Sequence, residues 1–439
     1  MAERCSPPTA TRRFLSVSLR YRIAKPLDSS HRLLQWSTAN LRFPQAGHES
    51  KRLTKTHDHD SSSFSTEIYL MSVGGATGRK FRMKQESQLV EKILRALPSI
   101  DVSSFKRSDL RPPKNSRRGP ASTGKPRRAP ASSWVRLGPG DDAAILSPSG
   151  KTDLVLSTDA FVENTHFRLK THPADSVGYK SLARATSDLA AMGATPRYFL
   201  LTLALPKNLT SDWLDDFLKG MARAARELRI SAIGGDTTTA AAVSISITVV
   251  GEAARGRAIP RSGARPGDLI YVSGKLGRAQ LGLELVLGGE ARNPRFRAAV
   301  QPHLYPKIQL ALGEWLAQNH LTTAMMDISD GLSTDLTRLC AASSGGARVW
   351  ADKIPCVIIP QAAATKLAKR KLDPLQMALH GGDDYELLFT VSPRDEKKIR
   401  RAPHHSHLVA IGEITRNRKL QLVDAGRRLP LKPLGWDPF

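Results

Sequence analysis

The chain has 439 residues, of which 40% are hydrophobic and 24% charged, so its length suits two domains, or three, of a globular protein. No uninterrupted apolar run approaches the roughly 18 residues of a membrane helix, and no membrane partner is expected. Its three cysteines, Cys5, Cys340 and Cys356, are too few for a disulfide framework and lack metal-site spacing, which favours a cytoplasmic location.

The formal net charge of +26 is unevenly distributed along the chain. Residues 1–133 carry a net charge of +16, and residues 134–439 carry +10. Residues 1–82 show no sustained periodicity, and three interpretations stay open: a downstream translation start, a disordered tail, or a targeting peptide, which an Arg- and Ser-rich opening superficially suits. Residues 83–133 are expected to form a short amphipathic helix from Met83, then a basic linker rich in Pro, Arg, Lys and Ser.

From Trp134 onward, β-rich runs alternate with helical patterns. Strands are expected at 154–158, 198–205 and 243–250; the second has the length of a buried strand and the third alternates cleanly. Helices are expected at 174–192 and 211–228, the latter with Ser211 as its N-cap.

The turn Arg265-Pro266-Gly267-Asp268 leads into an apolar strand at 269–272 and marks a domain junction. The second half repeats the mixed pattern, with helices at 278–287, 306–319 and 332–342 and a strand at 385–391. The sequence therefore predicts two α+β domains, at 134–266 and 267–439.

Short acidic motifs recur along the last three-quarters of the chain, mostly among small residues. They are Gly140-Asp141-Asp142, Ser157-Thr158-Asp159, Ser187-Asp188, Gly234-Gly235-Asp236, Asp327-Ile328-Ser329-Asp330, Asp335 and Gly381-Gly382-Asp383-Asp384. A cluster of hard divalent cations is the best physical reason for such carboxylates, because Mg²⁺ prefers carboxylate, hydroxyl and water oxygens. Such ions neutralise the charge that develops in phosphoryl transfer, which is the chemistry that the motifs predict.

Most of these motifs also have a plain structural explanation. The pair Asp141-Asp142 could form an ordinary Gly-Asp turn, and Asp159 could simply end a strand. Asp188 is more telling, because a carboxylate near a helix C-terminus opposes the helix dipole and costs stability unless a cation compensates. The paired glycines before Asp236 permit close approach of the backbone to phosphate, whereas Asp335 is expected in a solvated or capping role.

Other candidate sites are weaker. Residues 119–126 nearly match a phosphate-binding loop, but Pro126 stands where Ser or Thr must reach Mg²⁺ and no strand precedes the segment. The histidine tracts at 57–60 and 404–407 are more typical of polar loops than of metal sites. The basic linker lacks interleaved aromatic residues and any recognised module, so no nucleic-acid partner is expected.

From about Gly138 to the C-terminus, the order and sequences of the motifs closely resemble those of the thiamine-monophosphate kinases, which belong to the PurM-like superfamily of ATP-using enzymes. The matching stretches are GDDAAIL, STDAFVENTHF, SLARATSDLAAMGATPRYFLLTLALP, IGGDTTT, RSGARPGDLIYVSG, ISDGLSTDL and GGDDYELLFT. The resemblance implies a two-domain PurM-like fold, with an Mg- and ATP-binding domain at 134–266. It also implies a homodimer whose N-terminal domains pair through strands.

The implied reaction is direct, Mg-assisted phosphorylation of thiamine monophosphate by ATP, without a phosphoenzyme. No residue need act as a discrete base, because the acceptor is already a phosphate oxyanion. By position, the implied ligands of several Mg²⁺ ions are Asp142, Ser157, Thr158, Asp159, Asp188, Asp236, Asp327 and Asp330. The implied ATP-binding residues are Gly235, Asp236, Arg261 and Ser329, and the substrate-binding residues are His166, Asp383 and Trp436. The family often has Glu at the position of Asp383, and its C-terminal aromatic residue varies.

Two alternatives stay open. Another PurM-like synthetase, acting on selenide, formylglycinamidine ribotide or a hydrogenase maturation carrier, would share the fold. Such relatives differ in their nucleophile or in C-terminal Cys segments, and this chain has no Cys near its acidic motifs or its C-terminus. A basic nucleic-acid-binding protein is the alternative of another class. The concentration of the excess charge before residue 134 argues against it for the region that carries the motifs.

Overall fold

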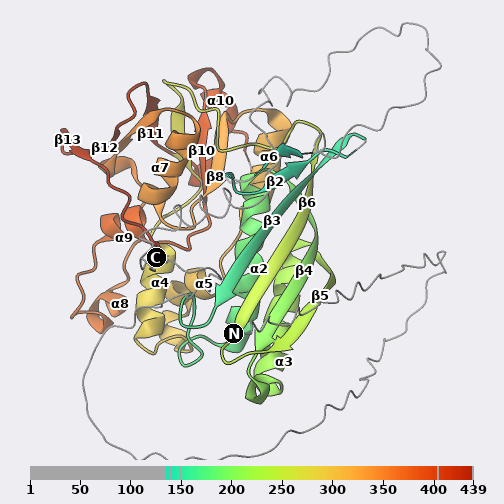
Figure 1. Ribbon diagram of the computed structural model, residues 1–439. Coiled ribbons are helices and arrows are strands. Elements are labelled where there is room, and N and C mark those ends of the chain that lie inside the picture. Colours follow the sequence, from blue (N-terminus) through green and yellow to red (C-terminus); the bar gives the residue numbers. More distant parts are fainter. Residues whose placement is uncertain (1–134, 139, 149, 403–404, 438–439) are drawn as a thin grey trace, which may run out of the picture. The chain divides into compact units, whose positions relative to one another are not determined.

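The structure is a computed structural model in which residues 135–138, 140–148, 150–402 and 405–437 are described (Figure 1). The segments predicted at 1–82 and 83–133, with the first histidine tract, lie outside the described residues, as does His404 of the second tract. None of the helices in the described ranges is long and apolar enough to cross a membrane.

The first half forms a six-stranded sheet in the order β1-β2-β3-β6-β4-β5. Its strands are β1 (Val135–Leu137), β2 (Ala144–Leu146), β3 (Thr152–Val162), β4 (Thr195–Leu205), β5 (Ser231–Thr239) and β6 (Ser244–Ala254). Neighbouring strands are antiparallel, except that β4 and β5 are parallel. The strands predicted at 154–158 and 243–250 are therefore confirmed as parts of β3 and β6.

Two helices, α2 (Ala174–Ala191) and α3 (Asp212–Leu228), cover one face of this sheet and share its hydrophobic core (Figure 1). They cross at two glycines: a Cβ on Gly178 would lie 1.9 Å from the carbonyl oxygen of Phe217, and one on Gly220 would lie 1.8 Å from that of Asp175. Both predicted helices are confirmed. Ser211 is the N-cap residue of α3, although its side chain makes no capping hydrogen bond.

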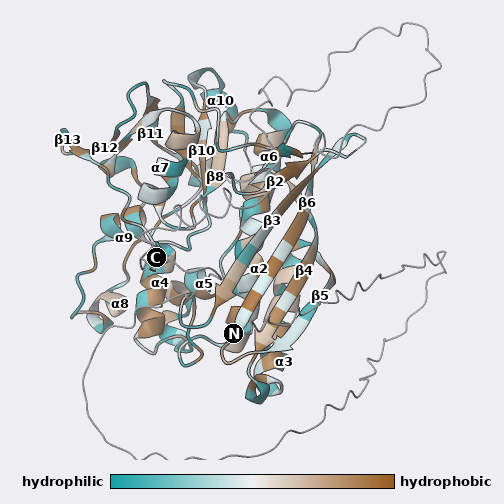
Figure 2. Cartoon of the chain, in the orientation of Figure 1, coloured by the Kyte–Doolittle hydropathy of each residue, from teal (hydrophilic) through white to brown (hydrophobic). Residues whose placement is uncertain are grey.

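The strand predicted at 198–205 is confirmed as part of β4, but β4 buries only one of its faces. Its residues alternate between the core and solvent, with Tyr198 46% and Leu200 39% exposed. Figure 2 shows an alternation of hydrophobic and hydrophilic residues along β6, whereas β4 carries apolar residues on its exposed face as well. Beside β4, the edge strand β5 is exposed throughout, including Ile233 at 58%. An apolar run of eight residues cannot by itself distinguish one buried face from two.

The second half forms a seven-stranded sheet in the order β13-β12-β9-β11-β7-β10-β8. Its strands are β7 (Leu269–Val272), β8 (Ala324–Asp327), β9 (Gly346–Trp350), β10 (Leu387–Val391), β11 (Val409–Thr415), β12 (Leu420–Asp424) and β13 (Arg427–Pro430). The strands are antiparallel apart from the parallel pair β9 and β12.

Helices of the second half pack on this sheet and around its edges. They are α4 (Arg278–Leu287), α5 (Arg297–Leu304), α6 (Leu310–Asn319), α7 (Leu332–Ala342), α8 (Gln361–Lys366), α9 (Pro374–His380) and α10 (Glu396–Ile399). The predictions for α4, α7 and β7 are confirmed at both ends, whereas α6 begins at Leu310 rather than at 306 and β10 at Leu387 rather than at 385. Two sheets, each with its own helices, confirm the α+β class.

The C-terminal end of α2 packs closely against α6 of the second half. A Cβ on Gly313 would lie 2.2 Å from the carbonyl oxygen of Ala190, and one on Gly193 would lie 2.6 Å from Cβ of Ala317. Ala190 and Ala191 share a core cluster with residues of α6 and β10. This contact places the last turn of α2, which carries Asp188, beside the end of β8, which carries Asp327.

Candidate active site

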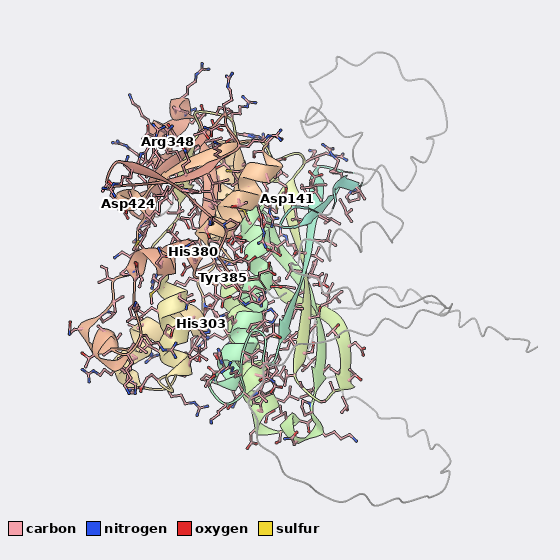
Figure 3. All side chains as sticks on the ribbon, turned by 60° about the vertical axis from the view of Figure 1, so that its left-hand side comes forward. Asp141, His303, Arg348, His380, Tyr385 and Asp424 are labelled. Carbon is pink, nitrogen blue, oxygen red and sulfur yellow. The ribbon has the colours of Figure 1, made fainter. Side chains whose placement is uncertain are left out.

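A cleft of about 1560 Å³ is lined by both halves of the chain. Figure 3 labels Asp141, Tyr385 and His303, which lie where the two halves of the chain meet. Twelve of the predicted site residues line the cleft: Asp142, Ser157, Thr158, Asp159, His166, Asp188, Arg261, Asp327, Ser329, Asp330, Asp383 and Trp436. Motifs from both halves of the sequence therefore meet in one place.

Three carboxylates from separate elements form a cluster in the cleft. One oxygen each of Asp142, Asp188 and Asp327 lies within 4.8 Å of the other two. Burial, with the neighbouring charge of Asp142, raises the pKa of Asp327 to about 7. Burial, with the charge of Asp327, also raises the pKa of Asp188 well above its usual range. This repulsion destabilises the cluster when it holds no cation.

The cluster has the oxygen ligands that a divalent cation requires. Oδ2 of Asp142 is buried and has no hydrogen-bond partner among the described residues. Ser157 Oγ donates to the Asp188 carboxylate and lies 3.1 Å from the carbonyl oxygen of Asp142. Ser187 Oγ donates to Asp327 over 2.5 Å. Thr158 turns to the opposite face of β3, where its Oγ1 lies 3.0 Å from Oγ1 of Thr248. Carboxylate and hydroxyl oxygens gathered in this way fit Mg²⁺.

Three arginines form ion pairs with carboxylates of the cleft. Arg184 binds Asp159 through two hydrogen bonds, of 2.6 and 3.1 Å. Arg261 pairs through its guanidinium with Asp142, and its backbone N–H donates to Asp141 over 2.9 Å. Arg338 pairs with Asp330. Asp142 thus has an arginine partner within the three-carboxylate cluster, whereas Asp159 and Asp330 have theirs outside it.

The loop from Asp327 to Asp330 is held by Asp335 of α7. This carboxylate is fully buried and accepts hydrogen bonds from the backbone N–H groups of Ser329, at 3.1 Å, and Asp330, at 3.0 Å. The predicted solvated role is wrong, because the side chain is buried. It does not cap α7 either, since the N-cap is Gly331 and the two donors lie in the loop before it.

At another part of the cleft, two aromatic rings from distant parts of the sequence lie together. The ring centroids of His166 and Trp436 are 5.3 Å apart. Trp436 is positioned by its backbone N–H, which donates to the carbonyl oxygen of Asp330 over 2.9 Å. Burial lowers the pKa of His166 to about 4, so its ring is neutral at pH 7. These rings could receive a flat ligand.

Asp383 is held by a buried polar network. Lys180 Nζ donates to Oδ2 over 2.7 Å, and the Tyr385 hydroxyl donates to Oδ1 over 2.8 Å. Nδ1 of His303 lies 3.6 Å from Oδ2. Although burial alone would raise it, the ammonium of Lys180 holds the pKa of Asp383 well below its usual range. The carboxylate is ionised and fixed, with its side chain 31% exposed.

Gly235 and Asp236 are the predicted site residues that do not line the described cleft. Both lie on the exposed edge strand β5, where Asp236 Oδ1 accepts a hydrogen bond from the backbone N–H of Thr237 over 2.8 Å. A Cβ on Gly235 would lie 1.8 Å from the carbonyl oxygen of Leu201. Close pairing with β4 is thus a second reason for a glycine at this position.

Sequence reasoning missed several polar residues of the site. Lys180, Arg184 and Asp188 follow one another at intervals of four along α2, so they lie on one face of a helix that is otherwise largely apolar. That spacing was a usable signal for Lys180 and Arg184. Ser187 belongs to the motif Ser187-Asp188, but nothing in that motif predicts that its hydroxyl would bind Asp327. Arg338 and His303 carried no local signal that would distinguish them from surface residues.

Family models match most of the described chain. The N-terminal domain of AIR synthase related proteins matches residues 140–253, and their C-terminal domain matches residues 265–425. Among curated proteins, the thiamine-monophosphate kinase of Haemophilus influenzae is 36% identical over 283 residues, which cover 64% of this chain and 83% of that protein.

Solved structures agree with this assignment. The structure of AaThiL complexed with AMPPCP and TMP is 27% identical, with a TM-score of 0.64, and covers 82% of this chain and 100% of that one. Hydrogenase maturation protein HypE in complex with ATP is 24% identical, with a TM-score of 0.53, over 67% of this chain and 88% of that one. This second likeness shows the shared fold alone. The PurM-like two-domain fold and the predicted resemblance are confirmed, and the chain belongs to the thiamine-monophosphate kinase family of AIR synthase related proteins.

Proposed function

We propose that this chain transfers the γ-phosphoryl group of ATP to thiamine monophosphate, giving thiamine diphosphate and ADP. One observation carries the proposal: a single cleft holds both the three-carboxylate cluster and the ring pair of His166 and Trp436, in a chain of this family. Relatives named thiamine-monophosphate kinase, and the structure of AaThiL with AMPPCP and TMP, support the two substrates.

Mg²⁺ fits the carboxylate cluster, and we propose several ions. Its direct ligands would come from Asp142, Asp188 and Asp327, whose oxygens already converge, together with Ser157, Asp159 and Asp330. Thr158 would contribute through its backbone, because its hydroxyl faces Thr248. When bound, such ions neutralise the negative charge of two phosphorylated substrates that must approach each other.

The protein's own residues would orient the two substrates. Arg261 would present a planar guanidinium for ATP phosphate at the carboxylate cluster, and Ser329, which lines the same cleft, would also bind ATP. Trp436 and the neutral His166 would receive the thiamine rings, with the positive thiazolium favouring an aromatic face. Asp383 would contribute a fixed negative charge at the same part of the cleft. No proton need be removed from the acceptor, since its phosphate oxygen is already an anion.

A homodimer is part of the proposal. Among the described strands, none pairs with the outer edge of β5, and exposed Ile233, Tyr198 and Leu200 lie on β5 and its neighbour. Exposed apolar strand edges are covered in most native proteins. The roles proposed for Gly235 and Asp236 in binding ATP and Mg²⁺ require a change at this edge, such as pairing with a second copy.

We place the enzyme in the cytoplasm, from its cysteine usage.

The deciding experiment is a coupled assay of the purified protein with ATP, Mg²⁺ and thiamine monophosphate. We expect thiamine diphosphate and ADP in equal amounts, with no activity when Mg²⁺ is chelated. ADP formation that does not depend on thiamine monophosphate would favour another PurM-like synthetase. Absence of product with a folded, full-length chain would contradict the proposal.

A further inference from the structure

Arg184 is a buried cation of the cleft to which the proposed mechanism gives no role. It lies in the middle of α2, and its side chain is only 15% exposed. Its guanidinium carbon lies 5.2 Å from the centre of the Phe161 ring. Two hydrogen bonds to Asp159 fix the guanidinium, which is thus held by β3 at both its polar edge and its flat face.

This position is intermediate between the two parts of the cleft. On one side is Asp159, a proposed metal ligand. On the other, the Phe161 ring lies 5.6 Å from that of His166, which in turn lies 5.3 Å from Trp436. A thiamine monophosphate molecule whose rings lie against His166 and Trp436, with its phosphate directed at the metal ligands, would pass Arg184.

The pairing of Arg184 with Asp159 must change when Asp159 binds a cation. A carboxylate that donates its electron pairs to Mg²⁺ interacts more weakly with a guanidinium, and a buried guanidinium left without a partner is costly. A phosphate is the best replacement, because the guanidinium fork matches two phosphate oxygens and stays charged at every physiological pH.

We propose that Arg184 binds the phosphate of the acceptor substrate, after exchanging Asp159 for it, and that this contact selects thiamine monophosphate over unphosphorylated thiamine. The inference rests on the proposed function, because it assumes that substrate. Arg261 and Arg338 are less suited to this role, since they pair with Asp142 and Asp330 rather than with the residue beside Phe161. Arg184 would be a substrate-binding residue and not a proton donor.

The exchange has a consequence that a purely structural arginine would not produce. While Arg184 holds Asp159, it competes with a divalent cation for the same carboxylate oxygens. Removing the guanidinium should therefore tighten the binding of Mg²⁺ in the absence of any nucleotide, while it weakens the binding of the phosphorylated acceptor. The two effects have opposite signs, and both follow from one pair of hydrogen bonds.

The test compares Arg184→Met and Arg184→Lys with the full-length chain. Arg348→Met is the matched control, because Arg348 also forms a half-buried pair, with Glu413 at 2.8 Å, and lies on β9 away from the cleft. Calorimetry would measure the dissociation constants for Mg²⁺ alone, for thiamine monophosphate and for thiamine. We expect Arg184→Met to weaken thiamine monophosphate binding roughly 10- to 100-fold, to leave thiamine unchanged, and to tighten Mg²⁺ binding at least threefold. Arg184→Lys should lie between, and Arg348→Met should match the parent.

The outcomes separate this inference from the proposed function. Equal weakening of thiamine and thiamine monophosphate, or no change in either, would overturn the role of Arg184 if the parent chain still phosphorylates thiamine monophosphate. If the parent chain neither binds nor phosphorylates it, the proposed function fails instead. Should Arg184→Met not fold, Arg184→Lys alone decides: it retains the charge and loses the fork, so unaltered discrimination against thiamine would overturn the inference.

Discussion

At the scale of single residues, the cleft holds carboxylates close together, and a bound cation would neutralise their mutual repulsion. Asp142, Asp188 and Asp327 converge within 4.8 Å, and burial raises the pKa of two of them. Arginines offset only part of this charge. This arrangement lowers the stability of the metal-free protein, but it holds the ligands of a cation in place before the cation binds.

Replacing Asp188 with Asn should therefore separate stability from activity. The variant loses a metal ligand, so turnover should fall at least 100-fold. Without divalent ions it should be more stable than the parent, by about 1–3 kcal/mol, because a buried like-charge contact is gone. Urea unfolding in the presence of a chelator, beside the steady-state assay, measures both quantities. A variant that is less stable and still active would show that Asp188 serves only the packing of α2.

Asp159 should behave differently from Asp188, because its charge is paired in the structure. Asp159→Ala leaves the buried Arg184 without its partner, so the metal-free protein should lose roughly 1–3 kcal/mol of stability. Turnover should also be abolished if Asp159 binds the cation. Near-normal turnover at saturating Mg²⁺ would remove Asp159 from the proposed ligands. The same urea and activity measurements on the two Asp variants provide an internal comparison.

Trp436→Ala tests the recognition of the thiamine rings. Trp436 is 39% exposed and lies against His166, so its removal opens one side of the proposed ring site. The KM for thiamine monophosphate should rise roughly 5- to 30-fold, as expected for about 1–2 kcal/mol of lost cation–π contact, and the KM for ATP should barely change. Kinetics with each substrate varied separately would measure this. An equal loss for both substrates would place Trp436 elsewhere.

At the scale of elements, a histidine pair links the loop before α2 to α5. Nε2 of His172 lies 3.2 Å from Nε2 of His303, and both side chains are buried. Burial lowers the pKa of His172 from 6.5 to about 4, and that of His303 falls well below its usual value. The unfolded chain binds protons on these residues below pH 6.5, whereas the folded chain does not.

Stability should consequently be lost as the pH falls from 6.5 toward 4, and it should be insensitive to these groups above pH 6.5. His172 alone can contribute up to about 3 kcal/mol over that range. The free energy of unfolding at pH 7.5 and pH 5 would measure the loss. A His172→Gln variant should show a smaller pH dependence than the parent. If the two dependences are equal, another group is responsible.

The helices and strands also show which features of the fold can be predicted from sequence patterns. The bounds of α4 and α7 followed from their apolar periodicity, because burial of one helix face is a local property of the sequence. The exposed face of β4 and the position of β5 did not follow, since they depend on which strands pair and which edge stays open. Likewise, the acidic motifs predicted a cation site. The partners of Asp159 and Asp383, which are Arg184 and Lys180, come from α2, and no motif encodes how that helix packs.

At the scale of the whole molecule, the proposed homodimer would form at the edge of the first sheet. It combines the outer edge of β5, which pairs with no other strand in the described ranges, with the exposed apolar side chains of Ile233, Tyr198 and Leu200. It also carries Gly235 and Asp236, which belong to a motif shared with the family but lie outside the described cleft. One arrangement would account for both facts: pairing at β5 would cover the edge and bring or shape these residues for catalysis.

Ile233→Arg should disrupt that pairing, because it places a charge on each copy at the centre of the contact. The matched control is Ile358→Arg, at a position of the second half that is 71% exposed and far along the chain from β5. Light scattering after size exclusion should show dimers for the parent and for Ile358→Arg, and monomers for Ile233→Arg. If Asp236 acts only in the dimer, turnover should fall with the dimer fraction and recover at high protein concentration. A monomeric Ile233→Arg variant with full turnover would show that each chain contains a complete site, and a dimeric one would place the interface on another surface.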